Sequence, residues 1–521
     1  MISTLSGQYR HKVKTVDELC GIFGPRPRKK TVVMCHGVFD LVHPGHIRHL
    51  LYAKSKADIL VASITSDEHI SKASYRPFVP QDLRALNLAA LEMVDYVIID
   101  GRSTPLENLA RIQPDFFAKG YEYAQEGLHP ETQNELEVLR SYGGELIFTP
   151  GDIVYSSSAI IESSPPNLAV EKLLTLMEAE GVTSARLREA LKKFKGVEIH
   201  VVGDTIVDSL TYTTMLGGMT KTPTSSVRFD KRVDYIGGAA IVAAHLSRAG
   251  AMVTLSTVLG DDTLKDFVLE ELGKAGVECK PIIDRMRLTT HKNVFVCNDH
   301  RLLKVDTVDN RSISDSVTEN LAAQIAFVPA RAVVFSDFRH GIFNRRTIPE
   351  LLAAIRPGVF RVADSQVASR WGNILDFRGF DLITPNEREA RFALADQDTG
   401  VRPLAERLHE EAQCKVLILK LGDRGVLTWR PRDHGDVRSF FVVDSFADRV
   451  LDAMGAGDAL LAYATLAMVA DGSDAVASIL GSFAAARECE VEGNVPVGPA
   501  DVLSKIEAVE RQANFEQRKD S

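Results

Sequence analysis

The sequence predicts two α/β domains, each built on a largely parallel sheet with helices on both faces. Short apolar runs alternate with amphipathic stretches in residues 29–163, and the same alternation returns after residue 197. The chain has 521 residues, which is too long for one domain at about 150 residues per domain. Hydrophobic residues make up 45% and charged residues 25%, so both halves can form apolar cores.

The first domain is expected over residues 29–165, after an N-terminal extension of residues 1–28. Four apolar runs predict buried strands, and two stretches with helical spacing of apolar residues predict helices between them. The strands are expected at residues 31–35, 58–64, 96–99 and 145–148, and the helices at residues 47–57 and 82–94. This strand–helix–strand order implies parallel strands joined by right-handed crossovers.

A turn-rich break at residues 163–167 ends the first half, and residues 166–195 are interpreted as a helical linker. The second domain is expected over residues 196–521, with a polar C-terminus. Its central strands are predicted at residues 197–202, 332–336, 359–363 and 416–419. Residues 293–296 and 301–305 alternate around Asn298-Asp299, which predicts a hairpin. We expect this hairpin in a small β lid over a second active site.

Charge, hydropathy and cysteine content argue against several classes of function. The net charge of -9 argues against general binding to nucleic acid. The longest apolar stretch, residues 459–470, is too short to cross a bilayer, and the first residues lack the apolar core of a secretory signal. No membrane association is therefore expected. Six cysteines without a C-x-x-C pair indicate the reduced thiols of a cytoplasmic protein.

Residues 37–46 read G-x-F-D-x-x-H-x-G-H directly after the first predicted strand. Pro44 suits the first position of a helix, so His43 and His46 stand at a helix start and face the same way. The free N–H groups and the dipole of a helix N-terminus suit an anion. Two imidazoles there can donate hydrogen bonds to an α-phosphate and a departing pyrophosphate. The pattern predicts a nucleotidyl-transfer site with His43 and His46 as catalytic residues.

This motif resembles the signature of the H-x-G-H nucleotidyltransferase superfamily, which implies a Rossmann-like fold for the first domain. Basic and serine-containing stretches follow in the order expected of its sugar-phosphate members. The resemblance implies nucleotide or phosphate binding by Gly37, Phe39, Asp40, Lys72, Arg76, Arg84, Lys119, Ser156, Ser157 and Ser158. Taken alone, Arg84 would be an exposed helix cation, and the serine run would be a helix N-cap. Mg²⁺ is expected to bridge the triphosphate of ATP or CTP.

Residues 452–458 read D-A-M-G-A-G-D and precede the apolar helix of residues 459–470. Small residues expose backbone N–H groups at a helix N-terminus, which can hold the charge of a transferring γ-phosphoryl group. Asp458 stands beside that anion hole, where it can accept the proton of an attacking hydroxyl. The pattern predicts a phosphoryl-transfer site with Asp458 as catalytic residue.

The second half resembles the ribokinase-like (PfkB) family of carbohydrate kinases from about residue 196 to the end. This resemblance implies a ribokinase-like α/β/α domain with a small β lid and the use of ATP. The family's motifs occur in the expected order, including the N-x-x-E of residues 386–389. The resemblance implies that the second site holds Asp204, Gly237, Gly238, Asp337, Asn386, Glu389, Gly422, Gly425, Gly455, Ala456 and Gly457, with Glu389 as an indirect Mg²⁺ ligand.

Together the halves resemble the family of bifunctional heptose-7-phosphate kinase/heptose-1-phosphate adenylyltransferases, with the domain order reversed. That family serves bacterial surface polysaccharide, including lipopolysaccharide. The chain departs from the family's kinase pattern at Ile241, His340, Gln366, Lys420 and Met454. Charge-assisted hydrogen bonds contribute about 1.5–3 kcal/mol each. The loss of two cations and an amide at the sugar side therefore predicts a different and less phosphorylated acceptor sugar, or a kinase half without activity.

The leading hypothesis is a bifunctional enzyme of nucleotide-sugar synthesis. Its second half phosphorylates a sugar or sugar phosphate with ATP, and its first half transfers a nucleotidyl group to a sugar phosphate. One alternative is a monofunctional cytidylyl- or adenylyltransferase whose degenerate kinase half serves regulation or oligomerisation. Another is a nucleotide-sensing binding protein without catalysis. The resemblance also implies a homo-oligomer, formed through the lid strands or the first domain.

Overall fold

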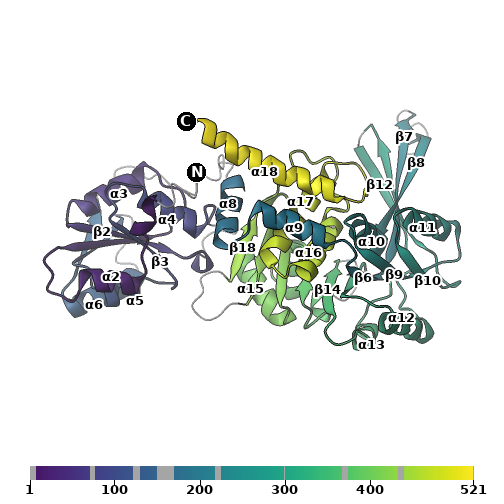
Figure 1. Cartoon of the computed structure of the whole chain (residues 1–521), viewed down its shortest axis with the longest axis horizontal. Helices are drawn as coiled ribbons and strands as arrows, with labels where there is room; N and C mark the ends of the chain where they lie inside the picture. Colours follow the sequence, from purple (N-terminus) through teal and green to yellow (C-terminus); the bar gives the residue numbers. More distant parts are fainter. Residues whose placement is uncertain are drawn as a thin grey trace. The chain divides into compact units, whose positions relative to one another are not determined.

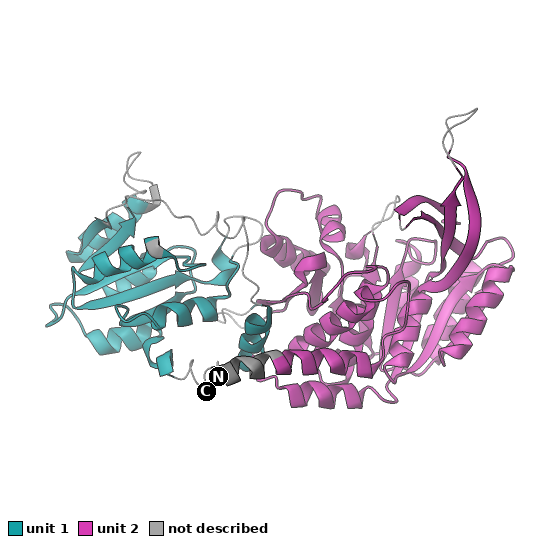
Figure 2. Ribbon diagram, turned by 90° about the horizontal axis from the view of Figure 1, so that it is seen from above, with its two compact units in different colours: residues 1–179, 432–439 teal, residues 180–431, 440–521 magenta. Residues whose placement is uncertain are grey.

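The computed structural model describes residues 8–70, 77–120, 130–149, 169–216, 225–298, 300–366, 373–431 and 439–519. The chain divides into two units by its internal contacts (Figure 2). Unit 1 comprises residues 1–179 and 432–439, and unit 2 comprises residues 180–431 and 440–521. The fold in each unit is α/β, as the sequence predicts.

Unit 1 contains a five-stranded parallel sheet in the order β3-β2-β1-β4-β5 (Figure 1). Its strands are β1 (Val32–Gly37), β2 (Ile59–Thr65), β3 (Tyr96–Asp100), β4 (Phe116–Gly120) and β5 (Glu145–Thr149). Its helices are α2 (Val16–Phe23), α3 (Pro44–Lys54), α4 (Gln81–Ala89), α5 (Leu106–Ile112), α6 (Pro130–Tyr142) and α8 (Ala169–Ala179).

Alternate residues of the central strand β1 enter two different apolar clusters. Val33 and Cys35 pack with residues of α3 and α4, whereas Val32 and Met34 pack with residues of α2, α5 and α6. This is the period of two that a strand covered on both faces requires. The strands predicted for this half are all present, and β4 was not recognised as a strand from the sequence.

The two predicted helices of unit 1 differ from the observed ones at their ends. Helix α3 begins at Pro44, as the position of this proline predicts, and therefore starts before the apolar spacing of residues 47–57; it ends at Lys54 rather than at residue 57. Helix α4 covers Gln81–Ala89 rather than residues 82–94. Residues 90–94 form turns in which Leu91 N and Val94 N bond to backbone carbonyls three residues earlier.

Unit 2 contains a nine-stranded sheet in the order β10-β9-β6-β13-β14-β15-β16-β17-β18. In this order, the seven strands from β10 through β16 run parallel to one another, and β17 and β18 are antiparallel to their neighbours. The strands are β6 (Glu198–Gly203), β9 (Met252–Leu259), β10 (Glu278–Ile283), β13 (Ala332–Asp337), β14 (Phe360–Ser365), β15 (Leu382–Ile383), β16 (Val416–Lys420), β17 (Val426–Trp429) and β18 (Phe440–Val443).

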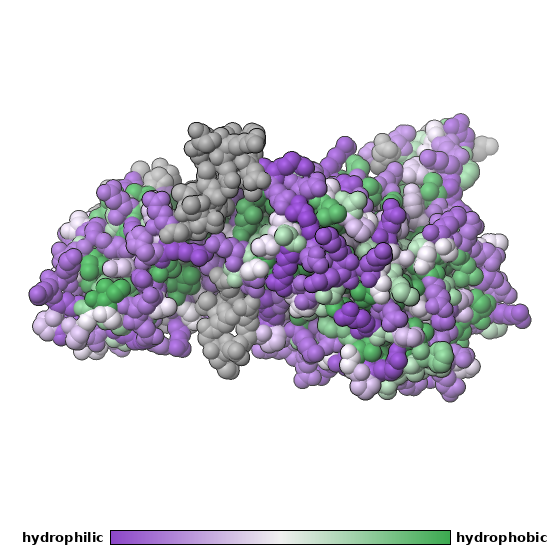
Figure 3. Space-filling model, viewed as in Figure 1, coloured by the Kyte–Doolittle hydropathy of each residue, from purple (hydrophilic) through white to green (hydrophobic). Residues whose placement is uncertain are grey.

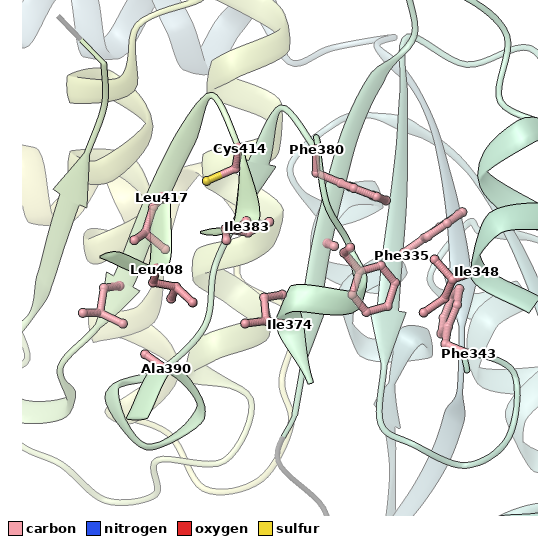
Figure 4. Close-up of a cluster of buried hydrophobic side chains, with 14 of the residues drawn as sticks. Phe335, Phe343, Ile348, Ile374, Phe380, Ile383, Ala390, Leu408, Cys414 and Leu417 are labelled. Carbon is pink, nitrogen blue, oxygen red and sulfur yellow. The ribbon is translucent and has the colours of Figure 1, made fainter. Parts of the chain in front are cut away.

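Helices pack on both faces of this sheet. Helix α10 contacts β6 and β9 and packs against α16, which packs against α17. On the other face α12 to α15 surround a core that includes Phe335, Phe343 and Phe380, with ring centroids 5.0–5.7 Å from Phe335 (Figure 4). The helices are α9 (Ser184–Lys193), α10 (Ala239–Arg248), α11 (Thr263–Lys274), α12 (Asp315–Phe327), α13 (Thr347–Ala353), α14 (Glu387–Leu394), α15 (Val401–Ala412), α16 (Ala456–Ala470), α17 (Asp474–Cys489) and α18 (Pro499–Lys519).

A second sheet of unit 2, the lid, has four strands in the order β12-β11-β7-β8. They are β7 (Thr205–Met215), β8 (Val227–Gly238), β11 (Thr290–Cys297) and β12 (His300–Thr307). Strands β11 and β12 form the antiparallel hairpin that the sequence predicts. Strand β7 leaves directly after β6, and β8 leads into α10, so the lid is joined to the central sheet near Asp204 (Figure 1).

The predicted linker, residues 166–195, contains two helices in its described part. The division between the units falls between Ala179 and Glu180. Helix α8 buries Val170, Leu173 and Met177, and α9 packs on α16, α17 and α18. These helices therefore have apolar contacts within unit 1 and unit 2, respectively.

In the described part of the chain, the helices are either too short or too polar to span a membrane. On the face shown in Figure 3, apolar residues lie in small patches among hydrophilic ones. Such scattered apolar residues are normal for a protein surface.

Candidate active sites

The first candidate site lies where the chain order of the unit 1 sheet reverses. Strand β1 is flanked by β2 on one side and by β4 on the other. In open parallel sheets, ligands bind at the carboxyl ends of the strands beside such a switch point. The H-x-G-H segment follows the carboxyl end of β1, and Lys119 lies near the carboxyl end of β4. The topology therefore brings these two motifs to the same edge of the sheet.

His43 and His46 stack at the N-terminus of α3. Their ring centroids are 3.9 Å apart and the rings are inclined by 25°. His43 Nδ1 accepts a hydrogen bond of 3.1 Å from Gly45 N. A nitrogen that accepts cannot carry the proton of a neutral imidazole, so that proton is on Nε2. His43 thus presents an Nε2–H donor at the helix start.

Both imidazoles are poised as neutral groups. Burial, followed by the charge of Arg48, lowers the pKa of His43. Burial lowers the pKa of His46 to about 4, with further lowering by His43 and His49. A neutral imidazole keeps one N–H group, which can donate a hydrogen bond to phosphate.

The loop before α3 has a shape that depends on its small residues. A Cβ on Gly45 would lie 2.9 Å from His43 Cε1, so glycine is needed for the His43 ring to cover the helix start. Phe39 has φ of 49°, and its ring lies 5.0 Å from the His46 ring. A Cβ on Gly37 would lie 3.3 Å from the Phe39 ring. Gly37, Phe39, His43 and His46 therefore lie together.

Asp40 is buried beneath this loop and contacts backbone groups. Its carboxylate accepts hydrogen bonds from Phe78 N at 2.9 Å and Val79 N at 2.7 Å. These bonds join the H-x-G-H loop to the segment that enters α4. The contacts support a positioning role for Asp40, and direct binding of phosphate by Asp40 stays a prediction.

Arg84 is fully buried, which differs from the exposed helix cation that the residue alone would suggest. Its guanidinium donates to Val38 O at 2.5 Å, to Thr65 O at 2.9 Å and to Asp67 Oδ1 at 2.5 Å. Arg84 thereby connects the loop after β1 with the end of β2. Helix amphipathicity could not reveal this role, because the partners lie 17 to 46 residues away in sequence.

We expect Arg84→Met to destabilise unit 1 by about 3–5 kcal/mol, since it leaves buried oxygens and a carboxylate without their cation. Hydrogen exchange of unit 1 peptides at increasing urea concentration measures this loss, because both tryptophans, Trp371 and Trp429, belong to unit 2 and fluorescence would report on that unit. The matched control is Arg102→Met, because Arg102 is exposed and pairs with Glu107 at the surface. Unchanged stability together with a raised KM for the nucleotide would instead make Arg84 a phosphate ligand.

Lys119 lies near the carboxyl end of β4 and is already paired. Its ammonium donates to Glu135 Oε2 at 2.5 Å and to Thr132 Oγ1 at 3.1 Å. Lys119 also contributes to the low pKa of His36, which burial lowers to about 4. His36 bonds to Ser63 and Thr65 of β2 and was not recognised from the sequence. Lys72, Arg76, Ser156, Ser157 and Ser158 lie outside the described residues.

The second candidate site lies at the carboxyl edge of the unit 2 sheet. Strands β6, β13, β14 and β16 end there, followed or closed by Asp204, Asp337, Asp364 and Lys420. Gly455 caps α16 with φ of 77°, and Ala456, Gly457 and Asp458 form its first turn. A side chain on Gly455 would meet Glu488 Oε1 at 2.7 Å and Asn494 Oδ1 at 2.8 Å. Small residues are thus required for this helix start.

Asp458 has the electrostatic character of a proton acceptor. Burial, followed by the charge of Asp364, raises its pKa to about 8, and Lys420 opposes this shift. A general base functions best with a pKa near the working pH. A raised pKa of this size in a buried carboxyl group at a helix start is typical of functional sites.

Asp204 and Asp337 form a buried carboxylate pair. Asp204 Oδ2 accepts from Phe338 N at 3.0 Å and from His340 N at 3.1 Å. Asp337 accepts from Ser365 Oγ at 2.8 Å and pairs with the Arg339 guanidinium at 2.9 Å. Burial raises the pKa of both carboxyl groups. These contacts hold the turn after β13 in place. They support a positioning role for Asp204 and Asp337 at the carboxyl edge of the sheet.

The di-glycine turn makes room for another carboxylate. A Cβ on Gly237 would lie 2.1 Å from Asp208 Oδ2, and a Cβ on Gly238 would lie 2.3 Å from Asp204 O. Gly238 also has φ of 61°. These glycines let β7 and β8 approach each other closely beside Asp208.

Asn386 and Glu389 form a capping box at α14. Asn386 Oδ1 accepts from Glu389 N at 2.9 Å, and Glu389 Oε2 accepts from Asn386 N at 2.7 Å. Glu389 Oε1 accepts from Asn386 Nδ2 at 2.6 Å. Both Glu389 oxygens therefore already have donors. Among the described residues, no three His, Cys, Asp or Glu side chains lie close enough to hold a metal ion by themselves.

A cleft of about 1230 Å³ opens beside this capping box. Asn386, Arg388, Lys420, Leu421 and Gly422 are among its lining residues. Its volume is sufficient for a nucleotide. Gly422 has φ of 66°, and a Cβ on Gly425 would lie 2.1 Å from Val443 O, so both glycines shape the turn next to the cleft.

The lid supplies residues that the motif analysis missed. In register across the sheet, Tyr235, Asp208, Lys292 and Asp306 form one row, so their side chains share a face. The charges of Asp208 and Lys292 both act on Asp458. Lys304 belongs to the same face through its register with Val294, and it acts on Asp208. The alternation of polar residues in the predicted hairpin could have indicated this polar face. The pairing of β11 with β7 was not visible in the sequence.

Ile241 and His340, two of the residues that depart from the family's kinase pattern, can be located in the structure. Ile241 is fully buried in α10. His340 Nδ1 lies 2.8 Å from Asn310 Oδ1, and burial lowers the pKa of His340 to about 3. Lys292 and Lys304 both lie near His340, since both lower its pKa. Lys292 and Lys304 of the lid thus supply positive charge at the sugar side of the site, where the sequence predicts the loss of two cations.

Comparisons with known proteins agree with this geometry. The pattern of "pfkB family carbohydrate kinase" matches residues 197–496, and that of "Cytidylyltransferase-like" matches residues 34–163. Bifunctional protein HldE of Geobacter metallireducens is 38% identical over 138 residues, which are 26% of this chain and 27% of the relative. Its counterpart in Bradyrhizobium is 27% identical over 314 residues, 58% of this chain and 62% of the relative.

The first relatives are thus matched over less than two thirds of their own length. Among solved structures, phosphofructokinase-2 from Escherichia coli in complex with substrates and products is similar with a TM-score of 0.51. It is 17% identical, and the match covers 60% of this chain and 100% of that one. At this identity the likeness shows the fold alone.

Proposed function

Because the chain belongs to the pfkB family of carbohydrate kinases and also carries a cytidylyltransferase-like domain, we propose that it is a bifunctional enzyme of nucleotide-sugar synthesis. Unit 1 transfers a nucleotidyl group from ATP or CTP to a sugar phosphate. Unit 2 phosphorylates a sugar or sugar phosphate with ATP. The observation that carries the proposal is the stacked pair His43 and His46 at the start of α3.

In unit 1 the substrate brings its own nucleophile. An ionised oxygen of the sugar phosphate attacks the α-phosphorus, and the bond from that phosphorus to the β-phosphate bridging oxygen breaks, so pyrophosphate leaves. No base is needed, since the attacking oxygen is already deprotonated. The N–H groups of α3 and the Nε2–H of His43 donate to the charge that develops. Fixed donors of this kind need no rearrangement during the reaction.

In unit 2 the acceptor hydroxyl attacks the γ-phosphorus and gives its proton to the Asp458 carboxylate. The bond between the γ-phosphorus and the β-phosphate oxygen breaks, and ADP leaves. The first-turn N–H groups of α16 hold the transferring phosphoryl group. Asp208, beside Asp458 in electrostatic range, is suited to accept a hydrogen bond from a sugar hydroxyl.

The acceptor is expected to carry a phosphate. Lys292 and Lys304 from the lid surround Asp208, and they offset the positive charge lost through His340 and Gln366. Two ammonium groups on one face can bind a phosphate dianion. The heptose phosphates implied by the family resemblance are the first acceptors to test.

Mg²⁺ fits this site only as a phosphate-bound ion. The carboxylates of Glu389 and Asp364 already accept hydrogen bonds from Asn386, Thr384 and Lys420. Mg²⁺ in nucleotide sites commonly keeps several waters and takes few protein ligands. When bound, it neutralises triphosphate charge, and Glu389 would contact it through water.

The oligomeric state and compartment are further parts of the proposal. Strand β12 is exposed along its length and carries Leu302, Leu303 and Val305 at the surface of the lid, which supports a homo-oligomer through lid strands. The six cysteines are free thiols. This supports a reducing compartment such as the cytoplasm.

The decisive experiment identifies products by mass spectrometry after incubation with ATP or CTP and a panel of sugars, sugar phosphates and sugar 1-phosphates. We expect pyrophosphate with a nucleotide-sugar from one sugar 1-phosphate, and ADP with a bisphosphorylated product from a sugar phosphate. Pyrophosphate without ADP would leave the alternative of a transferase with a degenerate kinase half. The buried Ile241 favours that alternative. The absence of both products would contradict the proposal.

A further inference from the structure

Lys420 lies between the nucleotide cleft and the anion hole of unit 2. Its Nζ donates to Asp364 Oδ1 at 2.9 Å. A Cβ placed on Gly457 would lie 3.2 Å from the same Nζ, so the ammonium touches the first turn of α16. Lys420 also lines the cleft together with Asn386, Leu421 and Gly422. One cation thus lies next to both the cleft and the helix start.

The position of Lys420 is fixed by its backbone and by Asp364. Lys420 N donates to Pro385 O at 2.8 Å, and residues 386 and 420 form a parallel bridge. Asp364 also accepts from Thr384 Oγ1 at 3.0 Å, which holds the carboxylate against the end of β15. The ion pair therefore aims the ammonium toward α16.

The ammonium keeps its charge in this place. Burial alone would lower its pKa, but Asp364, Glu389 and Asp458 together raise the pKa of Lys420. A cation is unfavourable at a helix N-terminus, where the dipole is already positive. The combination of N–H groups and an ammonium suits a ligand with several negative charges.

We propose that Lys420 binds the terminal phosphates of the nucleotide in unit 2, and that Asp364 is its positioning residue. An ammonium has three N–H donors and the bond to Asp364 uses one, so the pair can persist while phosphate binds. This inference rests on the proposed kinase function for its substrate, and it names a cation that the family pattern lacks at this position.

The test compares Lys420→Met with Lys415→Met in the full-length protein. Lys415 directly precedes the same strand, but its side chain is exposed and pairs with the buried Asp381, away from Asp364 and α16. Hydrogen exchange of residues 452–460 is measured by mass spectrometry during titration with ATP, AMP or inorganic phosphate. This readout belongs to unit 2 alone and needs no turnover. ADP formation and pyrophosphate formation are recorded in parallel.

In wild type and Lys415→Met, we expect ATP to protect residues 452–460. In Lys420→Met, half-protection should need at least about tenfold more ATP, the size expected from one charge-assisted hydrogen bond. The AMP concentration that gives half-protection should differ less than about twofold between Lys420→Met and wild type, because AMP has no terminal phosphates. A merely structural role would shift ATP and AMP equally, and that result would overturn the proposal, as would an unchanged ATP titration.

A second variant guards against misfolding. Asp364→Asn with Lys420→Met removes both charges of the pair, and it should show the same selective loss for ATP. Absence of ATP protection in wild type would overturn the inference. Protection in wild type without ADP from any sugar would refute kinase activity while leaving Lys420 as a nucleotide ligand.

Discussion

Pyrophosphate release falls by about a hundred- to thousandfold when either His43 or His46 is replaced, because each imidazole supplies a fixed donor to the developing phosphate charge. The variants are His43→Asn and His46→Ala. Asparagine can still cap α3, so the first variant keeps the helix start while losing the Nε2–H donor. Pyrophosphate formation from ATP or CTP with the accepted sugar 1-phosphate is the measurement.

The control for this result is His49→Ala, one turn further along α3. Its imidazole lies near His46 but outside the predicted site, so the rate should remain within about twofold of wild type, as is usual for substitutions away from the reacting groups. ADP formation by unit 2 should be unchanged in all three variants. Equal loss in His49→Ala, or retention of the rate in His46→Ala, would contradict the assigned role of the pair.

ADP formation falls by about a hundred- to ten-thousandfold in Asp458→Asn, the range of general-base catalysis. Asparagine has similar size and cannot accept the proton. In wild type, kcat/KM for ADP formation should rise with pH and level off above about 8, because the base acts only when ionised and its pKa is raised to about 8. The measurement is coupled detection of ADP from pH 6 to 9.

Stability provides the control for Asp458→Asn. Burial raises the pKa of Asp458 above its ordinary value, so the folded state binds this proton more tightly than the unfolded state does. The stabilisation of the folded state by this tightly bound proton is fully present below the ordinary pKa of an aspartate, and it is lost as pH rises towards about 8. Asp458→Asn should therefore melt at a higher temperature than wild type at pH 8. A lower melting temperature would mean that lost activity reflects misfolding.

The fold could be predicted in outline because its strands are continuous apolar runs. The predicted strands at residues 332–336 and 416–419 correspond to β13 and β16 within one residue at each end. Strand β15 has two residues and could not be recognised from so short a run. Lid strands β7 and β8 also escaped prediction, because their half-exposed pattern depends on which sheet they join.

The candidate sites were predictable where the chemistry is contiguous. His43 and His46 are three residues apart, and Gly455 to Asp458 are adjacent, so local spacing predicts which groups meet. Arg84 was different. It was expected among phosphate ligands, whereas its described contacts are with Val38, Thr65 and Asp67. Which acceptors a buried cation meets depends on chain crossings that no local pattern encodes.

By itself, the sequence determined the two α/β halves and two helix starts suited to phosphate, because strand and helix periodicity and capping are local properties. Only the tertiary structure decided which charges face one another. Asp208 and Lys292 are 84 positions apart and meet in one lid row, and Lys420 meets Asp364 across neighbouring parts of the sheet edge. The pKa of a buried group depends on distance and desolvation in space, so these partners became visible only in the folded chain.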